Sequence, residues 1–164
     1  MKKRGRLISS KGQRLLCAAA MVVSVGAVAA ALYTQHRLGM EPCPWCVLQR
    51  LIFLAIAVAA LPGLLVGTRV ASWLSGALMA LLALCGGAAA LWQHFVAAGS
   101  QSCAMTLADR VVRGLSLDEI APAVFSATAP CSQAATLLGV PYEFYSLVLF
   151  SGLLVWSVWV MRRA

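Results

Sequence analysis

Four apolar runs, each close to the length of a membrane-spanning helix, constrain the fold of this chain more than any other feature of its sequence. A helix rises about 1.5 Å per residue, so about 20 apolar residues cross a hydrocarbon core of about 30 Å. The runs cover residues 15–33, 47–67, 72–98 and 144–161. A bilayer offers no partners to backbone polar groups, which favours helices in these runs. We therefore predict an all-α fold, an integral membrane four-helix bundle.

The basic residues lie at the flanks of these runs rather than on a nucleic-acid-binding face. The chain carries a net charge of +8, but 62% of its residues are hydrophobic and only 11% are charged. Soluble domains are about 45–50% apolar and about 25% charged, so lipid is the expected solvent. The following basic residues precede the first run: Lys2, Lys3, Arg4, Arg6, Lys11 and Arg14. This pattern indicates a cytoplasmic flank and excludes nucleic acid as a partner.

A cleaved signal peptide is the alternative interpretation of the first run. Ala27, Val28 and Ala29 resemble a cleavage site. The apolar regions of signal peptides are about 7–15 residues long, however, and this uncharged run covers 19 residues. We therefore favour a first membrane span.

The segments between the runs alternate between the two sides of the membrane. Residues 1–14, the turn 68–71 and residues 162–164 share one side, and the loops 34–46 and 99–143 share the other. Lysine and arginine concentrate on the first side, so the positive-inside rule places both termini in the cytoplasm. In a bacterium the two loops then face the periplasm, where disulfides persist. We predict one domain in the bacterial inner membrane, in contact with the lipid bilayer.

The long outer loop contains one predicted amphipathic helix. Leu107, Val111 and Leu115 recur at helical spacing, which predicts a short interfacial helix on the membrane surface. Residues 116–119 have the capping-box pattern and predict the start of a further turn. At the start of the third run, Ser72 is the predicted cap.

Cys43 and Cys46 form a C-x-x-C motif where the first outer loop meets the second apolar run. This motif either binds zinc or exchanges thiols with disulfides. A zinc site needs a second ligand pair, but Cys103 and Cys131 are far apart in the sequence and the two histidines form no H-x₃₋₅-H pair. We therefore predict no metal. A static structural disulfide remains the simplest alternative to redox exchange.

The position of Cys46 favours a reactive thiol. Pro44 suits the first position of a helix, so the second helix is expected to begin near Cys46. The N-terminus of a helix favours a thiolate, and Arg50 follows four residues later on the same helix face. Its side chain can snorkel to the boundary, which makes an interfacial anchor the alternative role for this arginine. A thiolate at this depth can meet an electron acceptor dissolved in the bilayer, and a quinone is the obvious candidate.

Three further side chains near the outer boundary extend this hypothesis. His94 could help to bind or protonate a quinone oxygen, although a lone histidine there is often only an interface residue. Trp45 and Trp92 could line an acceptor pocket, but tryptophans at this depth commonly form the aromatic belt.

The other cysteines complete a possible electron relay. Cys103 and Cys131 can form a second disulfide in the polar loop, where a soluble partner can reach it. A partner thiol would attack this disulfide, the C-x-x-C pair would reoxidise it, and two electrons would then pass to the quinone. Cys17 and Cys85 lie inside apolar runs and are expected to pack as small buried residues.

Taken together, these features resemble the DsbB family, the bacterial disulfide bond formation proteins that use a quinone to reoxidise the periplasmic dithiol oxidase DsbA. The shared features are four spans, a C-x-x-C motif before the second span with an arginine four residues on, and a cysteine pair in the second outer loop. The resemblance covers nearly the whole chain. It implies DsbA and the membrane quinone pool as partners, with ubiquinone or menaquinone as the electron acceptor.

The resemblance also implies a role for each candidate site residue. Cys43 and Cys46 would form the quinone-linked disulfide, with Cys46 reacting with the ring. Cys103 would be attacked by DsbA, and Cys131 would be its disulfide mate, able to pair transiently with Cys43. Quinone binding would involve two further residues, Arg50 and His94.

Two alternative functions remain open at this point. A vitamin-K-epoxide-reductase-like enzyme is also a quinone-linked helical bundle, but its C-x-x-C motif typically lies near the fourth span, whereas here it precedes the second. A membrane adaptor with two inert disulfides would need no quinone. Loss of quinone reduction on changing Cys46 distinguishes the oxidoreductase from the adaptor.

Overall fold

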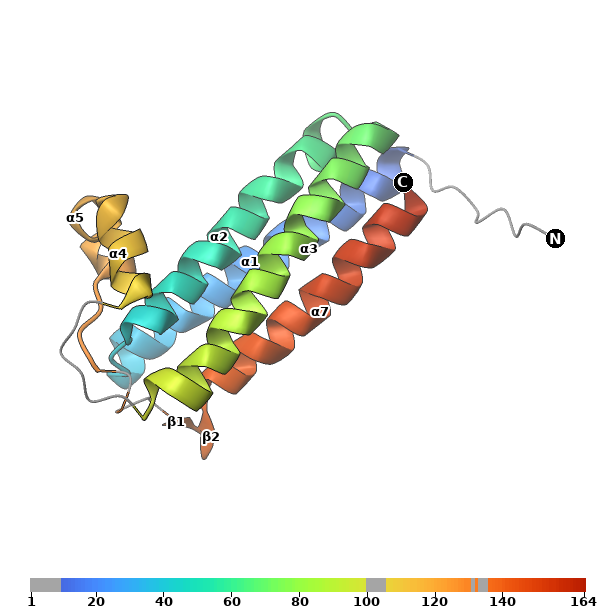
Figure 1. Ribbon diagram of the computed structural model, residues 1–164. Coiled ribbons are helices and arrows are strands. Elements are labelled where there is room, and N and C mark those ends of the chain that lie inside the picture. The colour runs from blue at the N-terminus through green and yellow to red at the C-terminus, as the bar shows by residue number, and fades with distance from the viewer. Residues whose placement is uncertain (1–9, 100–105, 131, 133–135) are drawn as a thin grey trace.

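Four long helices lie side by side in alternating directions and form a bundle in the computed structural model (Figure 1), which describes residues 10–99, 106–130, 132 and 136–164. They are α1 (Ser10–Leu38), α2 (Pro44–Leu65), α3 (Arg69–Trp92) and α7 (Tyr142–Arg163). Within the described part of the chain, these are the helices long and apolar enough to cross a membrane, with α3 extended to Ala97. The predicted all-α four-helix membrane bundle is confirmed.

Short elements occupy the end of the bundle opposite the start of α1 (Figure 1). The π-helical turn η1 (Gln93–Ala97) continues α3. It is followed by α4 (Leu107–Gly114), α5 (Leu117–Ile120), α6 (Pro122–Phe125), β1 (Thr136–Leu137) and β2 (Val140–Pro141). The two strands pair in an antiparallel hairpin, the one departure from helix in this chain's regular structure among the described residues.

The start of α2 is set by the residues around the C-x-x-C motif. The helix begins at Pro44, as its fit to the first helical position predicted, because proline has no N–H to satisfy there. Cys43 takes the N-cap position, where its Sγ accepts a hydrogen bond from the N–H of Cys46 at 3.3 Å. The helix ends at Leu65, two residues before Gly67, whose φ of +67° suits glycine.

Two predicted caps are wrong. Thr68, not Ser72, caps α3, and its hydroxyl accepts from the N–H of Ala71 at 3.3 Å. Ser72 is instead buried within the helix and donates to Gln13 Oε1 of α1. In the outer loop, the predicted further turn is present as α5 directly after Ser116, but this serine, with a left-handed φ of +51°, makes no side-chain cap.

Helix α4 is the predicted short amphipathic helix, and its true capping box joins Thr106 to Asp109. Its buried residues are Ala108 and Val112. The predicted stripe, which begins at Leu107, is therefore exposed and directed away from the bundle, where a lipid surface can cover it.

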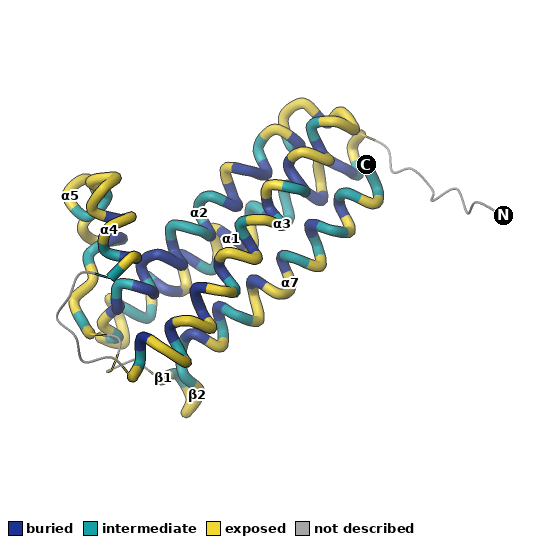
Figure 2. The backbone as a smooth tube through the Cα atoms, viewed as in Figure 1, coloured by how far each residue is buried: buried dark blue, intermediate teal, exposed yellow. Residues whose placement is uncertain are grey.

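Exposed residues line the outward faces of the long helices (Figure 2), and many of them are large and apolar. Val22 of α1, Val58 of α2, Leu81 of α3 and Val155 of α7 are all more than half exposed. Water would oppose such a surface, whereas lipid accepts it, so the chain is a multi-pass membrane protein. Cys85 belongs to this exposed surface, and the prediction that it packs in the interior is wrong because it lies on the outer face of α3.

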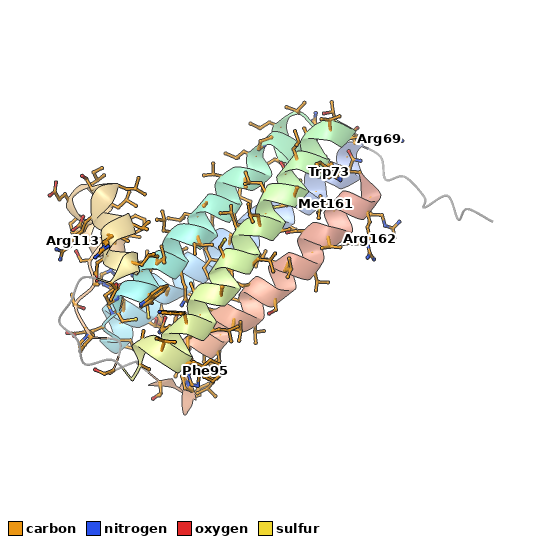
Figure 3. The ribbon with its side chains drawn as sticks, viewed as in Figure 1. Arg69, Trp73, Phe95, Arg113, Met161 and Arg162 are labelled. Carbon is orange, nitrogen blue, oxygen red and sulfur yellow. The ribbon has the colours of Figure 1, made fainter. Side chains whose placement is uncertain are left out.

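The basic residues mark the two ends of the bundle differently. Arg69 and Arg162 lie at the end that carries the C-terminus, and Arg113 lies at the opposite end with α4 (Figure 3). The end with Arg69 is also tied together by polar contacts between helices. Arg14 donates to the carbonyl of Val66 at 3.2 Å, and Gln13 donates to the carbonyl of Arg163 at 3.4 Å.

Close packing in the bundle interior depends on a small residue opposite an aromatic pair. Phe53 of α2 and Phe150 of α7 stack with ring centroids 4.0 Å apart. Phe150 is fully buried, and its ring lies directly against Gly86 of α3, where a Cβ would overlap it. Glycine at this position lets α3 and α7 approach closely.

We expect Gly86→Ala to destabilise the bundle by about 1–3 kcal/mol, because the added methyl group overpacks the Phe53–Phe150 stack. Thermal unfolding of the purified protein in detergent measures the change. Gly152→Ala on α7 is the matched control, since a Cβ there meets nothing within 4 Å. Equal unfolding temperatures for the two variants would contradict this account of the packing.

Candidate functional site

The two sulfurs of the C-x-x-C motif lie together in the first turn of α2. Cys43 is buried, with 2% of its surface exposed, and Cys46 is half-buried. Their Sγ atoms are 2.9 Å apart, a hydrogen-bond distance between thiols. A disulfide needs about 2.05 Å, so a small local movement is enough to interconvert the reduced and oxidised forms.

Both sulfurs face a cavity of about 240 Å³ at this end of the bundle. Its walls come from α1, α2 and α7 together with the first outer loop and η1. Polar side chains gather around the sulfurs, whereas alanines of α1 and the side chains of Phe53 and Leu149 make the rest apolar. The polar lining residues are Thr34, Glu41, Gln49, Arg50, Gln93, Tyr142, Tyr145 and Ser146.

Arg50 is brought into this site, as predicted from its spacing, but it is not a surface anchor. Only 6% of its surface is exposed. Its guanidinium donates to Gln35 Oε1 at 2.6 Å and to the carbonyl of Val124 at 3.0 Å. Since both partners are neutral, they satisfy the buried cation without cancelling its charge, and the guanidinium interacts electrostatically with both cysteines.

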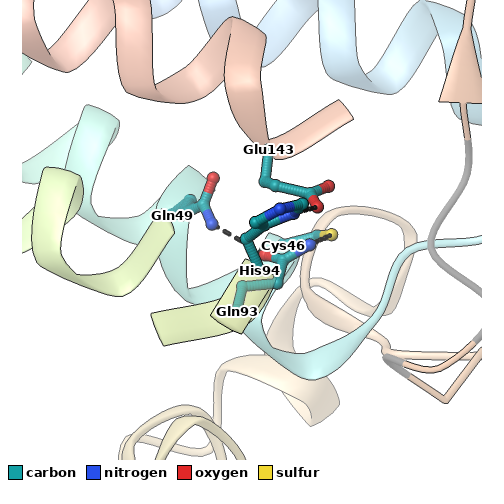
Figure 4. A network of polar contacts seen from close by, with 5 residues as sticks. All are labelled: Cys46, Gln49, Gln93, His94 and Glu143. Carbon is teal, nitrogen blue, oxygen red and sulfur yellow. Dashed lines mark hydrogen bonds and ion pairs between the residues drawn. The ribbon is translucent and has the colours of Figure 1, made fainter. Parts of the chain in front are cut away.

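Two buried glutamines complete the surroundings of Cys46 (Figure 4). Gln93 Nε2 donates to Cys46 Sγ at 3.3 Å, and Gln49 Nε2 donates to Gln93 Oε1 at 2.8 Å. Sequence reasoning missed both residues. The available signal was an uncharged amide inside each of two apolar runs, because polar side chains at membrane depth are costly unless they are paired.

His94 points to a different partner. Figure 4 shows His94 beside Glu143, and its Nδ1 lies 2.9 Å from Oε1 of that residue. Its ring packs edge-on against Phe144 at a centroid distance of 4.7 Å. Glu143 is 3% exposed, and its Oε2 has no hydrogen-bond partner among the described residues. The structure does not place His94 in the cavity lining, so its role in quinone binding stays a prediction.

The two tryptophans near the motif contact each other rather than the cavity. Trp45 is buried and Trp92 is about half exposed, with ring centroids 6.3 Å apart. Neither contributes to the cavity lining. Trp45 belongs instead to a small apolar cluster that also contains Cys43 and Ala108 of α4.

Cys103 and Cys131 lie outside the described residues, so the second disulfide stays a prediction. Described residues close to each of them in the sequence contact the C-x-x-C motif or Pro42, which directly precedes it. Ala108 packs in the same cluster as Cys43, and the N–H groups of Thr128 and Ala129 donate to the carbonyl of Pro42 at 3.0 and 3.3 Å. Among the residues the structure describes, no group of three histidines, cysteines or carboxylates is arranged to hold a metal ion.

Comparison with known proteins identifies similar sequences over almost the entire length. A family described as disulfide bond formation protein DsbB matches residues 13–160. A disulfide bond formation protein B of Chromobacterium violaceum is 33% identical over 165 residues, covering 97% of each chain. Disulfide bond formation protein B 1 of Pseudomonas aeruginosa is 32% identical and covers 92% of this chain and 96% of its own. The disulfide bond formation protein B of Aromatoleum aromaticum is also 32% identical, and the match covers 92% of this chain and 93% of the relative.

The pairing of His94 with Glu143 predicts a stability effect that is separate from any role in binding a ligand. We expect His94→Ala to lower the free energy of unfolding by about 1–3 kcal/mol, because the buried Glu143 carboxylate loses its hydrogen-bond partner. Adding Glu143→Gln should recover part of the loss, since a neutral amide costs less to bury than a carboxylate. Thermal unfolding measures both, with His36→Ala at an exposed position as control. Additive losses in the double variant would show that the pair is not coupled.

Proposed function

Because this chain belongs to the DsbB family, and is thus a membrane thiol oxidoreductase that reoxidises DsbA, we propose that it passes the electrons to a quinone of the membrane. Ubiquinone and menaquinone are the candidate acceptors. One observation carries the proposal, namely that Cys46 and Arg50 line an apolar cavity within the membrane-spanning bundle. Membership of this family also sets aside the vitamin-K-epoxide-reductase-like alternative.

The chemistry of the cavity lining fits a quinone. A quinone has two carbonyl oxygens that accept hydrogen bonds, and Arg50, Gln49 and Tyr142 bring donors to the cavity. Phe53 and Leu149 offer apolar contact for a ring. When bound, a quinone supplies an acceptor for two electrons and two protons.

The arrangement of α1 and α7 supports access from lipid. These two helices pack against each other much less extensively than α3 packs against α7. The cavity is lined by residues of both helices, and its wall on α1 consists of Ala27, Ala30, Ala31 and Thr34, all of them small. An isoprenoid tail could extend between the two helices into the bilayer while the ring stays beside the sulfurs.

The proposed reaction balances as two thiol–disulfide exchanges and one reduction. A DsbA thiolate attacks Cys103, the bond between Cys103 and Cys131 breaks, and DsbA leaves as a disulfide. The two loop thiols then reduce the disulfide between Cys43 and Cys46, with Cys131 pairing transiently with Cys43. Finally, Cys43 and Cys46 reform their disulfide, giving two electrons and two protons to the quinone, which becomes a quinol. The packing of Ala108 beside Cys43 and the hydrogen bonds from Thr128 and Ala129 to Pro42 support an exchange between the outer loop and the motif.

Arg50 is proposed to act in two stages of this reaction. Its buried positive charge favours the thiolate of Cys46 over the neutral thiol. The same charge favours a quinone oxygen that gains negative charge during reduction, because electrostatic interactions are stronger away from water. His94 is proposed as a nearby site residue. To contact a quinone in the cavity, its side chain would have to turn away from Glu143.

We also propose the bacterial inner membrane as the location, with both termini in the cytoplasm. The bundle end that carries Arg69 and Arg162 would then meet the cytoplasmic leaflet, as the positive-inside rule requires. The C-x-x-C motif and the loop that contains Cys103 and Cys131 would face the periplasm, where DsbA can reach them.

The central test is quinone reduction by the purified protein supplied with reduced DsbA. We expect Cys46→Ser to abolish quinone reduction, because the sulfur that delivers the electrons is absent. Cys85→Ser is the matched control and should retain full activity, since this cysteine is exposed on the outer face of α3. Equal activity of Cys46→Ser and the wild type would favour the adaptor with inert disulfides.

A second test addresses the arginine. We expect Arg50→Ala to raise the KM for quinone about tenfold or more, which corresponds to one lost hydrogen bond to a charged group. The control is Arg37→Ala, which removes an exposed arginine at the end of α1. Steady-state kinetics with a soluble quinone analogue separate KM from kcat. An unchanged KM would place the acceptor away from Arg50.

A further inference from the structure

We propose that Gln93, oriented by Gln49, holds the Cys46 sulfur in its thiolate form through an uncharged hydrogen-bond donor. Gln93 touches the reacting sulfur, and Gln49 acts through Gln93 as a positioning residue. The inference deepens the proposed function, and only its kinetic readout rests on quinone being the acceptor. Nothing in the C-x-x-C motif itself implies these two residues, since they come from the interiors of α2 and the α3–η1 helix.

The direction of the hydrogen bonds decides which group meets the sulfur. Gln49 Nε2 donates to Gln93 Oε1 at 2.8 Å, so the oxygen of the second amide is already engaged. The NH₂ group of Gln93 is therefore turned toward Cys46 Sγ, 3.3 Å away (Figure 4). An amide oxygen in that place would repel a thiolate. By engaging the Gln93 oxygen, Gln49 therefore ensures that Gln93 presents its NH₂ donor to the sulfur.

Burial makes this contact strong. Gln93 is 0% exposed and Gln49 is 3% exposed, so water does not compete for either amide. A hydrogen bond to an ionised acceptor is about twice as strong as one between neutral groups, and a low dielectric strengthens it further. The amide therefore gains most when Cys46 is an anion and much less when it is a thiol or half of a disulfide.

The backbone at Gln93 supports the placement. The chain leaves regular α-helix at this residue, and the N–H of Ala98 donates to the carbonyl of Gln93 at 2.9 Å, five residues back. Such π turns occur frequently at functional sites. Here the turn buries the Gln93 side chain beside Cys46, while the next residue, His94, reaches Glu143. One widened turn thus sends two neighbouring polar side chains to separate partners.

An amide differs usefully from a charged group in this position. It does not gain or lose a proton, so it favours the thiolate without taking the thiol proton itself. In the reaction proposed above, the two thiol protons end on the quinol oxygens and the two electrons pass from the sulfurs. Gln93 exchanges neither, and it changes only the stability of the sulfur anion.

The direct test is the rate at which iodoacetamide alkylates Cys46 in the reduced, full-length protein in detergent at neutral pH. Mass spectrometry of the Cys46 peptide follows the reaction, with an added soluble peptide that contains one cysteine as the reference. We expect Gln93→Met, which keeps the volume but removes the donor, to slow alkylation about tenfold. Gln49→Met should slow it less, about threefold, because the donor remains but is no longer oriented.

The matched control is Gln13→Met. Gln13 is likewise a buried glutamine with hydrogen-bond partners on two other helices, but it lies at the opposite end of the bundle. The Gln13→Met variant should leave the alkylation rate of Cys46 unchanged, even if it lowers the unfolding temperature. A Gln93→Met rate within about twofold of the wild type, less than one ordinary hydrogen bond contributes, would overturn the proposal.

A second readout is the reduction potential of the pair formed by Cys43 and Cys46, measured by equilibration with glutathione. A contact that stabilises the reduced thiolate makes the pair more oxidising, so its loss should lower the potential. A tenfold effect on the equilibrium corresponds to about 30 mV for this two-electron couple. A purely structural glutamine would not affect this potential. An unchanged potential in Gln93→Met would therefore contradict a role in thiolate stabilisation.

Turnover separates this inference from the proposed function. With reduced DsbA and a quinone analogue, Gln93→Met should lower kcat while the KM for quinone stays within about twofold, in contrast to Arg50→Ala. If the wild type does not reduce quinone but the alkylation rates differ as expected, the quinone proposal fails alone. If the wild type reduces quinone and Gln93→Met matches it in rate and alkylation, the role of Gln93 fails alone.

A further variant covers the case in which Gln93→Met does not fold. Gln93→Glu retains the length of the side chain and can place a carboxylate beside the sulfur. Two neighbouring negative charges are unfavourable, so alkylation of Cys46 should be about tenfold slower than in the wild type, or slower still. Alkylation of Cys46 in Gln93→Glu as fast as in the wild type, or faster, would be incompatible with thiolate stabilisation by the native amide.

Discussion

The first turn of α2 is the constraint on which the rest of the structure depends. Proline at its first position and Cys43 at its cap start the helix within the C-x-x-C motif, so both sulfurs face one cavity. A start three residues later, where the apolar run begins, would leave the motif in an outer loop. Because this helix also spans the membrane, its first turn places the two cysteines where the outer loop meets the lipid-embedded part of the bundle.

The site satisfies its buried cation through hydrogen bonds to neutral groups. Arg50 is satisfied by an amide oxygen and a backbone carbonyl, so its positive charge remains available to an anion in the cavity. The buried carboxylate of Glu143 pairs instead with His94. The amides of Gln49 and Gln93 are hydrogen-bonded in series to Cys46, so an uncharged donor meets the sulfur there.

The bundle is built unevenly, and the unevenness serves the site. Small residues such as Gly86 let α3 and α7 pack closely around a fully buried aromatic ring. The polar contacts of Gln13 and Arg14 tie the helix ends together at the end of the bundle opposite the C-x-x-C motif. Between α1 and α7 the packing is sparse, and the cavity lies there. The other neighbouring helix pairs thus pack more extensively than the pair α1 and α7 on this side of the cavity.

The sequence by itself determined the four spans, the redox motif and the shared face of Cys46 and Arg50, because apolar length and helical spacing are local properties. Tertiary structure decided the rest of the site. Gln93 reaches Cys46 across 47 positions of sequence, and His94 reaches Glu143 across 49. It also decided that Cys85 faces outward and that α4 packs through Ala108. Such contacts depend on how each helix is rotated against its neighbours, and in a membrane both faces of a helix are apolar, so periodicity alone carries little information about that rotation.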